Sequence, residues 1–403
     1  MARRRHIAVI APPWYPLPPS GYGGTELVVH LLVQSLRKFG VRVTLYGCEG
    51  SAPGTTVMAE AGWSADLGQF DHTKREVTYA ARVLNHLEQL EDVELIHDNA
   101  EWLSTAMCSF SGIAPVVHTV HGPLDAPRVA AYQALGDRTN LVAISKRQHD
   151  DDPSLNWAGM VYNAVDVDSL DVGLRDDKEG YLLCLARITL EKGQHRAIEA
   201  ARRVGKRLVL AGKVGELPCE RKYFEEQVLP HIDGDRVIYH ENIAGATKAR
   251  MLARADALLH AVTFPEPFGL AMVEAMASGT PCIAMARGAA PELVTHGSTG
   301  FLCESVDDMV EYLGRLDEID PEDCAETVRA RFHPDRMAAG YMRVYDRVLA
   351  NASGASDTSE VLELAGSGNG RIRVTPPTND NDDMPREATG GRSGTRPIKG
   401  MAG

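Results

Sequence analysis

The chain has 403 residues, of which 44% are hydrophobic and 24% are charged. This length predicts roughly two or three domains, and the composition is ordinary for a globular protein. The formal net charge of −13 at pH 7 argues against a dedicated nucleic-acid-binding protein, because contacts with phosphates require a surplus of Lys and Arg.

The first residues do not predict a signal peptide. The apolar run at residues 7–11 is short, and Pro12 and Pro13 end it. No apolar stretch approaches the roughly 18 residues that a membrane span requires. The seven cysteines include no Cys-x-x-Cys pair, which favours reduced, mostly buried thiols and disfavours a structural zinc site. We therefore expect a cytoplasmic protein.

Short apolar runs alternate with amphipathic segments along the first part of the chain. Strands are expected at residues 6–11, 41–46, 94–97, 116–119, 141–144 and 159–162. Helices are expected between them, at residues 25–39, 77–90 and 103–110. Fully apolar short runs are typical of parallel strands buried on both faces, and their alternation with helices predicts a doubly wound sheet.

The alternation then restarts in the second part of the chain. Further strands are expected at residues 181–186, 207–211, 236–240, 257–261 and 281–285, and closing helices at 306–316, 322–331 and 334–349. The polar, Asp-rich segment 165–180 predicts a linker. We predict two α/β domains at 1–170 and 171–350, and a disordered tail without aromatic residues at 351–403.

The first candidate motif is the Pro- and Gly-rich loop 12–26, which follows the first expected strand. Such a loop exposes backbone N–H groups and the positive end of a helix, an arrangement that suits a phosphate. Gly21, Gly23 and Gly24 would permit close approach of a ligand. The spacing is not that of the dinucleotide-binding G-x-G-x-x-G motif, and the glycines could equally serve only the turns.

The second motif places Arg187 and Lys192 after the first strand of the second part, in the element A-R-x-x-x-x-K-G. An Arg can bind a phosphate with two N–H groups, and a Lys can add a point charge. The alternative is that both are solvated surface cations.

The third motif spans residues 265–281 and is the strongest. We expect a helix whose first turn contains Phe268, Gly269 and Leu270 and whose free N–H groups bind an anion or sugar oxygens. Glu266 lies just outside this helix start and Glu274 about two turns inside it. Both carboxylates could accept hydrogen bonds from hydroxyl groups. The apolar neighbours of Glu274 argue against a solvated surface position.

The third motif and residues 288–301 (GAAPELVTHGSTGF) resemble glycosyltransferase family 4, whose members are retaining, metal-independent GT-B enzymes that use sugar nucleotides. The A-R-x-x-x-x-K-G element and the Gly-Gly-Thr-Glu sequence of the first loop are also similar to that family. The resemblance extends over about residues 6–350. It implies two Rossmann-like domains facing a central cleft, the first for the acceptor and the second for the donor, with the last helix crossing back.

The resemblance also implies roles for residues of the second domain. Arg187 and Lys192 would bind the donor diphosphate, and Glu266 would hold a hydroxyl of the transferred sugar. The backbone of Phe268, Gly269 and Leu270 would lie near the sugar and phosphates, and Glu274 would bind the ribose hydroxyls.

Further roles follow for three other segments. The Gly23-Gly24 loop would close over the diphosphate, and His121 matches a histidine near the donor sugar. The backbone of Asn242 and Ile243 would lie against the base, although Asn242 stands where relatives often have Gly. The catalytic set implied by the resemblance is therefore Glu266, His121, Arg187 and Lys192.

Two groups of polar residues leave alternatives open. His118 and His121 could be metal ligands, but an expected strand would direct residues at this spacing to opposite faces. His121 could shuttle protons, since an ordinary histidine pKa is near neutrality, or it could simply be packed and hydrogen-bonded. Residues 98–102 (DNAEW), at the end of an expected strand, could contact the acceptor or cap a helix.

The resulting hypothesis is a retaining hexosyltransferase that uses a UDP- or GDP-sugar, with no metal or other cofactor. Its acceptor, a small molecule, glycan or lipid, is not identified by the sequence. A lipid acceptor would bring peripheral contact with a membrane, and the unpatterned insertion 57–74 could belong to the acceptor pocket. The alternatives are an epimerase or phosphorylase on the same fold, or a non-catalytic nucleotide-sugar-binding protein.

Overall fold

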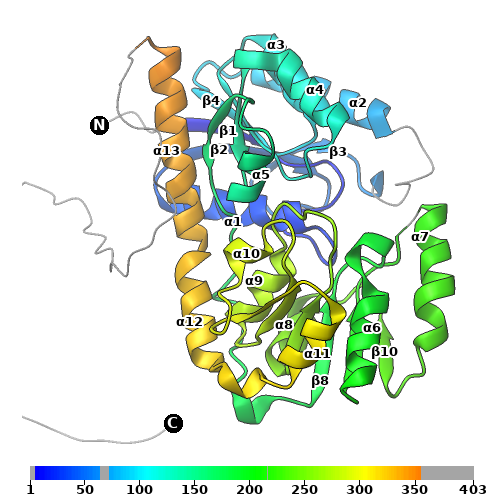
Figure 1. Ribbon diagram of the computed structural model, residues 1–403. Helices are drawn as coiled ribbons and strands as arrows, with labels where there is room; N and C mark the ends of the chain where they lie inside the picture. Colours follow the sequence, from blue (N-terminus) through cyan, green and yellow to red (C-terminus); the bar gives the residue numbers. More distant parts are fainter. Residues whose placement is uncertain (1–4, 64–71, 216, 355–403) are drawn as a thin grey trace, which may run out of the picture. The chain divides into compact units, whose positions relative to one another are not determined.

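The computed structural model describes residues 5–63, 72–215 and 217–354, which contain two parallel sheets with helices against them (Figure 1). The first sheet has seven strands in the order β3-β2-β1-β4-β5-β6-β7. These strands are β1 (His6–Ile10), β2 (Arg42–Cys48), β3 (Thr55–Ala59), β4 (Leu95–Asp98), β5 (Val116–Thr119), β6 (Thr139–Ala143) and β7 (Trp157–Met160). The predicted α/β class and doubly wound topology are confirmed.

The second sheet has six strands in the order β10-β9-β8-β11-β12-β13. They are β8 (Tyr181–Leu185), β9 (Arg207–Ala211), β10 (Val237–His240), β11 (Ala257–His260), β12 (Cys282–Met285) and β13 (Gly300–Cys303). In both sheets the strand order reverses beside the first strand, between β1 and β4 and between β8 and β11. Ligands of such sheets bind beyond the carboxyl ends of the strands at this switch point.

Thirteen α-helices connect and cover the strands within the part of the chain that the structure describes. In the first half they are α1 (Gly24–Lys38), α2 (His72–Leu87), α3 (Trp102–Ser111), α4 (Ala126–Leu135) and α5 (Lys146–Asp151). In the second half they are α6 (Gln194–Arg203), α7 (Pro218–Tyr223), α8 (Gly245–Arg254), α9 (Leu270–Ala277), α10 (Ala290–Leu293), α11 (Val306–Leu313), α12 (Pro321–Arg331) and α13 (Pro334–Ala352).

Helix α13 packs into the core of the first sheet, although it follows the second sheet in sequence (Figure 1). Its buried residues recur at a helical period and contact residues of β1 and α1; they are Met337, Ala338, Tyr341, Val344, Tyr345 and Val348. The apolar face of α13, near the end of the described chain, therefore packs against the elements at its beginning.

Several expected boundaries were wrong. The segment 57–74 is not one unpatterned insertion, because it contains most of β3 and the start of α2; residues 64–71 lie outside the described part. Strand β13 was missed because its apolar run is only three residues long. Helix α9 begins at Leu270, since Gly269 has a left-handed φ of +104°. Glu274 therefore lies one turn inside that helix rather than two.

The predicted tail is only partly described. Helix α13 continues to Ala352, so the first residues of the segment 351–403 are helical. The rest of that segment, from residue 355 onward, lies outside the described residues. None of the described helices is both long enough and apolar enough to cross a bilayer. All seven cysteines are free, and Cys219 is the exposed one.

Candidate active site

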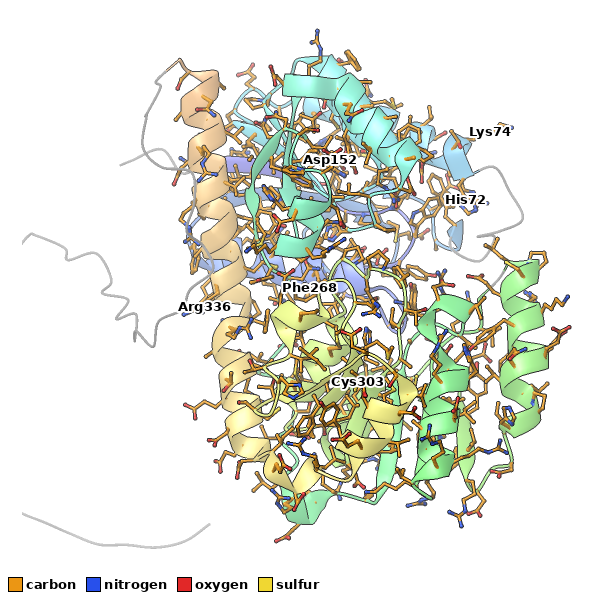
Figure 2. All side chains as sticks on the ribbon, viewed as in Figure 1. His72, Lys74, Asp152, Phe268, Cys303 and Arg336 are labelled. Carbon is orange, nitrogen blue, oxygen red and sulfur yellow. The ribbon has the colours of Figure 1, made fainter. Side chains whose placement is uncertain are left out.

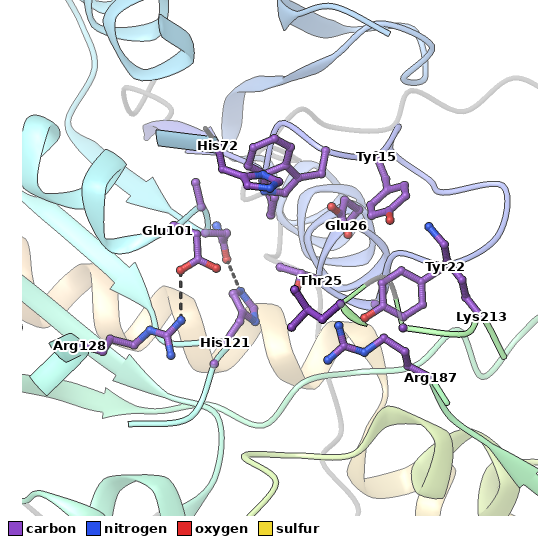
Figure 3. A pocket seen from close by; sticks show the side chains of 18 of the residues that line it. Tyr15, Tyr22, Thr25, Glu26, His72, Glu101, His121, Arg128, Arg187 and Lys213 are labelled. Atoms are coloured by element: carbon purple, nitrogen blue, oxygen red, sulfur yellow. Dashed lines mark hydrogen bonds and ion pairs between the residues drawn. The ribbon is translucent and has the colours of Figure 1, made fainter. Parts of the chain in front are cut away.

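Two adjoining cavities are built from loops of both sheets. The first, which we call the α9 cavity, has a volume of about 560 Å³ and is lined by the loop before α1, the ends of β8 and β9, the start of α8 and the start of α9. The second, which we call the His121 cavity, has about 510 Å³ and is shown in Figure 3. Tyr22, Gly24, Arg187 and Lys213 line both cavities and mark where they meet.

The starts of helices α1 and α9 come together at the α9 cavity. A Cβ atom added to Gly24 would lie 3.0 Å from Leu270 Cδ1, so a larger residue at position 24 would crowd the first residue of α9. The first turn of each helix has N–H groups without intrahelical partners and carries partial positive charge. The N-termini of two helices, one that follows a strand of the first sheet and one that follows a strand of the second, therefore face the same cavity. Such an arrangement favours the binding of an anion.

Glu274 projects from α9 and is only 6% exposed, so the prediction that it is not a solvated surface residue is confirmed. Lys248 Nζ, from α8, donates a hydrogen bond to Glu274 Oε1 at 2.6 Å. This pairing offsets the cost of burying a carboxylate. Both side chains line the α9 cavity, beside Asn242 and Ile243. The carboxylate is thus held in place and available to a hydroxyl donor.

Arg187 and Lys192 do not lie side by side in the cavities. Arg187 lines both, and its guanidinium lies 3.7 Å from Glu220 Oε1. Lys192 lines neither cavity; its Nζ donates to Glu266 Oε1 at 2.5 Å and lies 4.9 Å from the centre of the Phe264 ring. The two cations that the sequence grouped together therefore have different surroundings.

The Glu266 carboxylate is largely enclosed and lies between Lys192 and His260. Burial alone would raise the pKa of the Glu266 carboxyl, but the nearby Lys192 and His260 outweigh it and lower that pKa to about 2. Its Oε2 lies 3.0 Å from His260 Nε2 and makes no well-formed hydrogen bond to the described residues. Glu266 lines neither the α9 cavity nor the His121 cavity, so Lys192 and His260 are the polar side chains next to its carboxylate.

The loop that carries Glu266 is anchored by an aromatic cluster. Phe268 is buried where the two halves of the chain meet (Figure 2), with its ring centre 6.2 Å from that of Tyr162 and 5.9 Å from that of Phe332. Phe268 and Gly269 precede α9 and line neither cavity, whereas Leu270 lines the α9 cavity. The backbone between Glu266 and α9 is thereby fixed.

His121 follows β5 and faces the second cavity, where its Nε2 lies 3.1 Å from Asn99 Oδ1 (Figure 3). Burial, together with the neighbouring His118, lowers the pKa of His121 to about 3. A lowered pKa and the contact with Asn99 favour the alternative that His121 is packed and hydrogen-bonded over that of a proton shuttle. His118 is a packed histidine whose two ring nitrogens contact Thr105 Oγ1 at 2.7 Å and the Tyr132 hydroxyl at 2.9 Å.

The residues of the segment 98–102 have different surroundings, and helix α3 has no side-chain cap from Glu101 at its N-terminus. Asp98 is fully buried and accepts hydrogen bonds from the backbone N–H of Ala100 and the hydroxyl of Ser104, at the start of α3. Asn99 and Glu101 instead line the His121 cavity, where the Glu101 carboxylate lies 3.3 Å from Arg128 (Figure 3). Within the described residues, no group of three or more His, Cys, Asp or Glu side chains could hold a metal ion.

Several charged residues of these cavities were not expected from the sequence, among them Lys213, Lys248 and Glu26. Lys213 directly follows the Gly after β9 and lines both cavities, and Lys248 pairs with Glu274. The position of Lys213 after an expected strand could have identified it. Glu26, buried in the first turn of α1, lines the His121 cavity, and burial raises the pKa of its carboxyl to about 7.

Comparison with known proteins identifies the family. The family model described as glycosyl transferases group 1 matches residues 169–330, and the model of glycosyltransferase family 4 matches residues 22–157. N-acetyl-alpha-D-glucosaminyl L-malate synthase of Bacillus anthracis is 35% identical over 130 residues, which are 30% of this chain and 32% of the relative. Glycogen synthase of Mycobacterium tuberculosis is 30% identical over 38% of this chain and 37% of the relative. These matches span about a third of the length of each relative.

A longer but weaker likeness extends over most of the chain. D-inositol 3-phosphate glycosyltransferase of Mycobacteroides abscessus is 25% identical over 77% of this chain and 82% of the relative. Among solved structures, sucrose-phosphate synthase of Thermosynechococcus elongatus has a TM-score of 0.69 at 20% identity, covering 86% of this chain and all of the other. Anabaena HepE, solved with UDP-glucose, has a TM-score of 0.63 at 18% identity, over 87% of this chain and 99% of HepE. The chain belongs to the group 1 glycosyltransferases of family 4 and has the GT-B fold.

Proposed function

We propose that this protein is a retaining, metal-independent glycosyltransferase that takes a sugar from a UDP- or GDP-sugar. The observation that carries the proposal is the α9 cavity, in which two helix N-termini, Arg187 and the Lys248–Glu274 pair surround one space. Residues 1–170 would bind the acceptor and 171–350 the donor, with α13 crossing back to the first domain. The free thiols support a cytoplasmic location.

The donor would lie along the line that joins the two cavities. Its ribose hydroxyls would donate to Glu274, and its base would lie near the backbone of Asn242 and Ile243. Its diphosphate would lie at the junction, close to Gly23-Gly24, Arg187 and Lys213. The structure of Anabaena HepE with UDP-glucose supports a donor of this class.

Transfer breaks the bond between the anomeric carbon and the diphosphate oxygen while the acceptor oxygen bonds to the same carbon. Negative charge grows on the leaving diphosphate, where Arg187, Lys213 and the N–H groups of α1 and α9 stabilise it. By analogy with an oxyanion-hole donor, the loss of one such contact costs about 2.7–4 kcal/mol in the transition state. These groups would do the work that a divalent cation does in other transferases.

Attack from the face that the diphosphate leaves would retain the anomeric configuration. A donor phosphate oxygen can then accept the acceptor's proton, so no protein base is required. A neutral His121 fits this mechanism as a hydrogen-bonding group near the sugar. Glu266 would hold a hydroxyl of the transferred sugar, while Lys192 holds its Oε1 rather than binding phosphate.

The test is donor hydrolysis. Purified protein incubated with UDP- and GDP-sugars is expected to release the sugar slowly, with the first-formed anomer, observed by NMR, matching the donor. Activity is expected to be unchanged by EDTA. Binding without turnover would contradict a transferase, an inverted first product would contradict retention, and loss of activity with EDTA would contradict metal independence.

A further inference from the structure

Asn242 has a backbone conformation that few side chains tolerate. Its φ is +52°, and of the residues that the structure describes it is the one non-glycine residue with a left-handed φ. Asn adopts this conformation more readily than most residues, but glycine does so without strain. Glycine would fit this φ better than Asn, but glycine has no side chain with which to contact another part of the protein.

The Asn242 carboxamide contacts the loop before α1, in the other half of the chain. The backbone N–H of Tyr22 donates to Asn242 Oδ1 at 3.3 Å. A Cβ atom added to Gly21 would lie 2.7 Å from the same oxygen and 3.2 Å from Nδ2. The carboxamide therefore fits a space that glycine at position 21 leaves open.

This contact lies on the wall of the α9 cavity. Gly21, Tyr22 and Asn242 all line it, next to Gly23-Gly24. In Figure 3 the Tyr22 side chain lies beside Arg187 and Lys213, where the two cavities meet. The loop held by Asn242 is thus the loop that approaches the proposed diphosphate site.

We propose that Asn242 is a positioning residue that holds the loop 19–24 in place over the α9 cavity before the nucleotide diphosphate binds. The identity of the ligand rests on the proposed function, whereas the contact between Asn242 and Tyr22 does not depend on it. If the loop already has its binding conformation, less conformational entropy is lost when the nucleotide binds. The apparent affinity rises in proportion to the fraction of molecules whose loop has that conformation. One exposed hydrogen bond changes that fraction by about 2- to 10-fold.

The experiment compares Asn242→Gly, Gly21→Ala and the double variant with the wild-type protein. Affinity for UDP, GDP and ADP is measured by calorimetry, and donor KM and kcat are measured where hydrolysis is detected. Asn242→Gly removes the carboxamide and suits the left-handed φ, so its melting temperature is expected to match that of the wild type. Its affinity for the best-bound nucleotide is expected to fall about 2- to 10-fold. Donor KM should rise more than kcat falls.

Gly21→Ala provides a second, independent perturbation. Gly21 is not among the glycines with a positive φ, so alanine meets only the clash with Asn242. Gly21→Ala is expected to weaken nucleotide binding in the wild-type background and to have little further effect in the Asn242→Gly background. Glu241→Ala, which removes the exposed neighbouring side chain, is the matched control and should bind as the wild type does.

Hydrogen exchange in the absence of nucleotide separates this proposal from the proposed function. The peptide containing Tyr22 is expected to exchange faster in Asn242→Gly than in the wild type, whether or not a nucleotide binds. If none of the three nucleotides binds the wild type, the proposed function fails. The exchange rate of the Tyr22 peptide then still tests whether Asn242 holds the loop. Unchanged exchange, or additive effects of the two substitutions on affinity, would overturn the role of Asn242.

Discussion

Glu274, which is buried, and Glu266, which is mostly buried, lie on either side of the start of α9, and their partners differ. Lys248 holds Glu274 at the wall of the α9 cavity, whereas Lys192 and His260 hold Glu266 in a cluster that lines neither cavity. We expect Glu274→Ala to weaken binding of nucleotide diphosphates about tenfold or more, because a charge-assisted hydrogen bond contributes about 1.5–3 kcal/mol. Calorimetry with UDP and GDP measures this loss.

Glu266→Ala is expected to reduce kcat for donor hydrolysis while changing nucleotide affinity little. Glu199→Ala, which alters an exposed residue of α6, serves as the control for both variants. Comparable losses of affinity and of kcat in Glu266→Ala and Glu274→Ala would contradict separate roles for the two carboxylates.

The low pKa of His121 predicts a pH dependence of stability. Its pKa is about 3 in the folded chain, against an ordinary value of 6.5. Between these values the unfolded chain binds more protons, so this group lowers the free energy of unfolding as the pH falls from about 6.5 toward 3. Urea unfolding at pH 7 and pH 5 should show a smaller loss for His121→Asn than for the wild type, by roughly 1–2 kcal/mol. An identical loss in both proteins would contradict a buried, neutral imidazole.

The burial and partners of a single residue could be predicted from the sequence only where its neighbours along the chain surround it. The burial of Glu274 follows from the apolar residues around it on one helix. The pairing of Lys192 with Glu266 could not be predicted from spacing, because 74 residues separate them. The pKa of His121 depends on the closure of a cavity by residues from several segments, which no local pattern records.

The turn before α10 supports the element that carries Glu266. Gly288 has a φ of +56°, and a Cβ atom there would lie 2.3 Å from the backbone oxygen and 2.4 Å from the backbone nitrogen of Glu266. The N–H of Ala289 donates to that same oxygen at 3.0 Å. The turn and the Glu266 loop are thus packed backbone against backbone.

Gly288→Ala is therefore expected to displace the Glu266 loop, lowering the melting temperature and reducing kcat by more than tenfold. Gly297→Ala is the matched control, since Gly297 also has a left-handed φ, of +78°, but its added Cβ would meet no atom within 4 Å. Gly297→Ala therefore introduces only the backbone strain of alanine at a left-handed φ, about 1–2 kcal/mol, and no steric clash. Equal loss of kcat in both variants would contradict a supporting role for this turn.

Most elements could be predicted because their apolar runs are long enough to show a period. Strand β5 has the predicted bounds, and α9 ends just before Gly279, whose φ of +72° is typical of a glycine that ends a helix. Strands β3 (TTVMA) and β13 (GFLC) each have an apolar run of only three residues, which is too short to identify a strand. The start of α9 depends on the φ of Gly269, which composition does not reveal.

At the scale of the whole described chain, Glu292 links the two halves away from the cavities. Its carboxylate, on α10, accepts hydrogen bonds from the backbone N–H of Lys146 at 2.8 Å and of Arg147 at 2.6 Å, at the start of α5. It also accepts one from the Tyr162 hydroxyl at 2.9 Å. The first and second sheets are therefore joined by a side chain as well as by the chain itself and by α13.

Glu292→Ala is expected to lower the melting temperature by several degrees, because it leaves the Lys146 and Arg147 N–H groups and the Tyr162 hydroxyl without this acceptor. Glu292→Gln keeps one carbonyl oxygen and should have an intermediate effect. Calorimetric unfolding of the three proteins gives the comparison. A melting temperature of Glu292→Ala equal to that of the wild type would show that this link does not stabilise the chain.

The arrangement of two α/β halves could be predicted from the restart of the strand–helix alternation. The contacts that connect the halves could not, because Asn242 with Tyr22 and Glu292 with α5 pair residues far apart in sequence. Such pairs leave no periodic pattern. The motifs predicted which loops line the two cavities, while the geometry of the cavities came only from the structure.

A crystal structure with UDP or GDP, whichever raises the melting temperature more, tests the central claim most directly. The diphosphate is expected between Gly24 and the start of α9, within hydrogen-bond distance of Arg187, with the ribose hydroxyls on Glu274 and no metal ion between the phosphates and the protein. A diphosphate bound elsewhere, or held through a metal ion, would contradict the account.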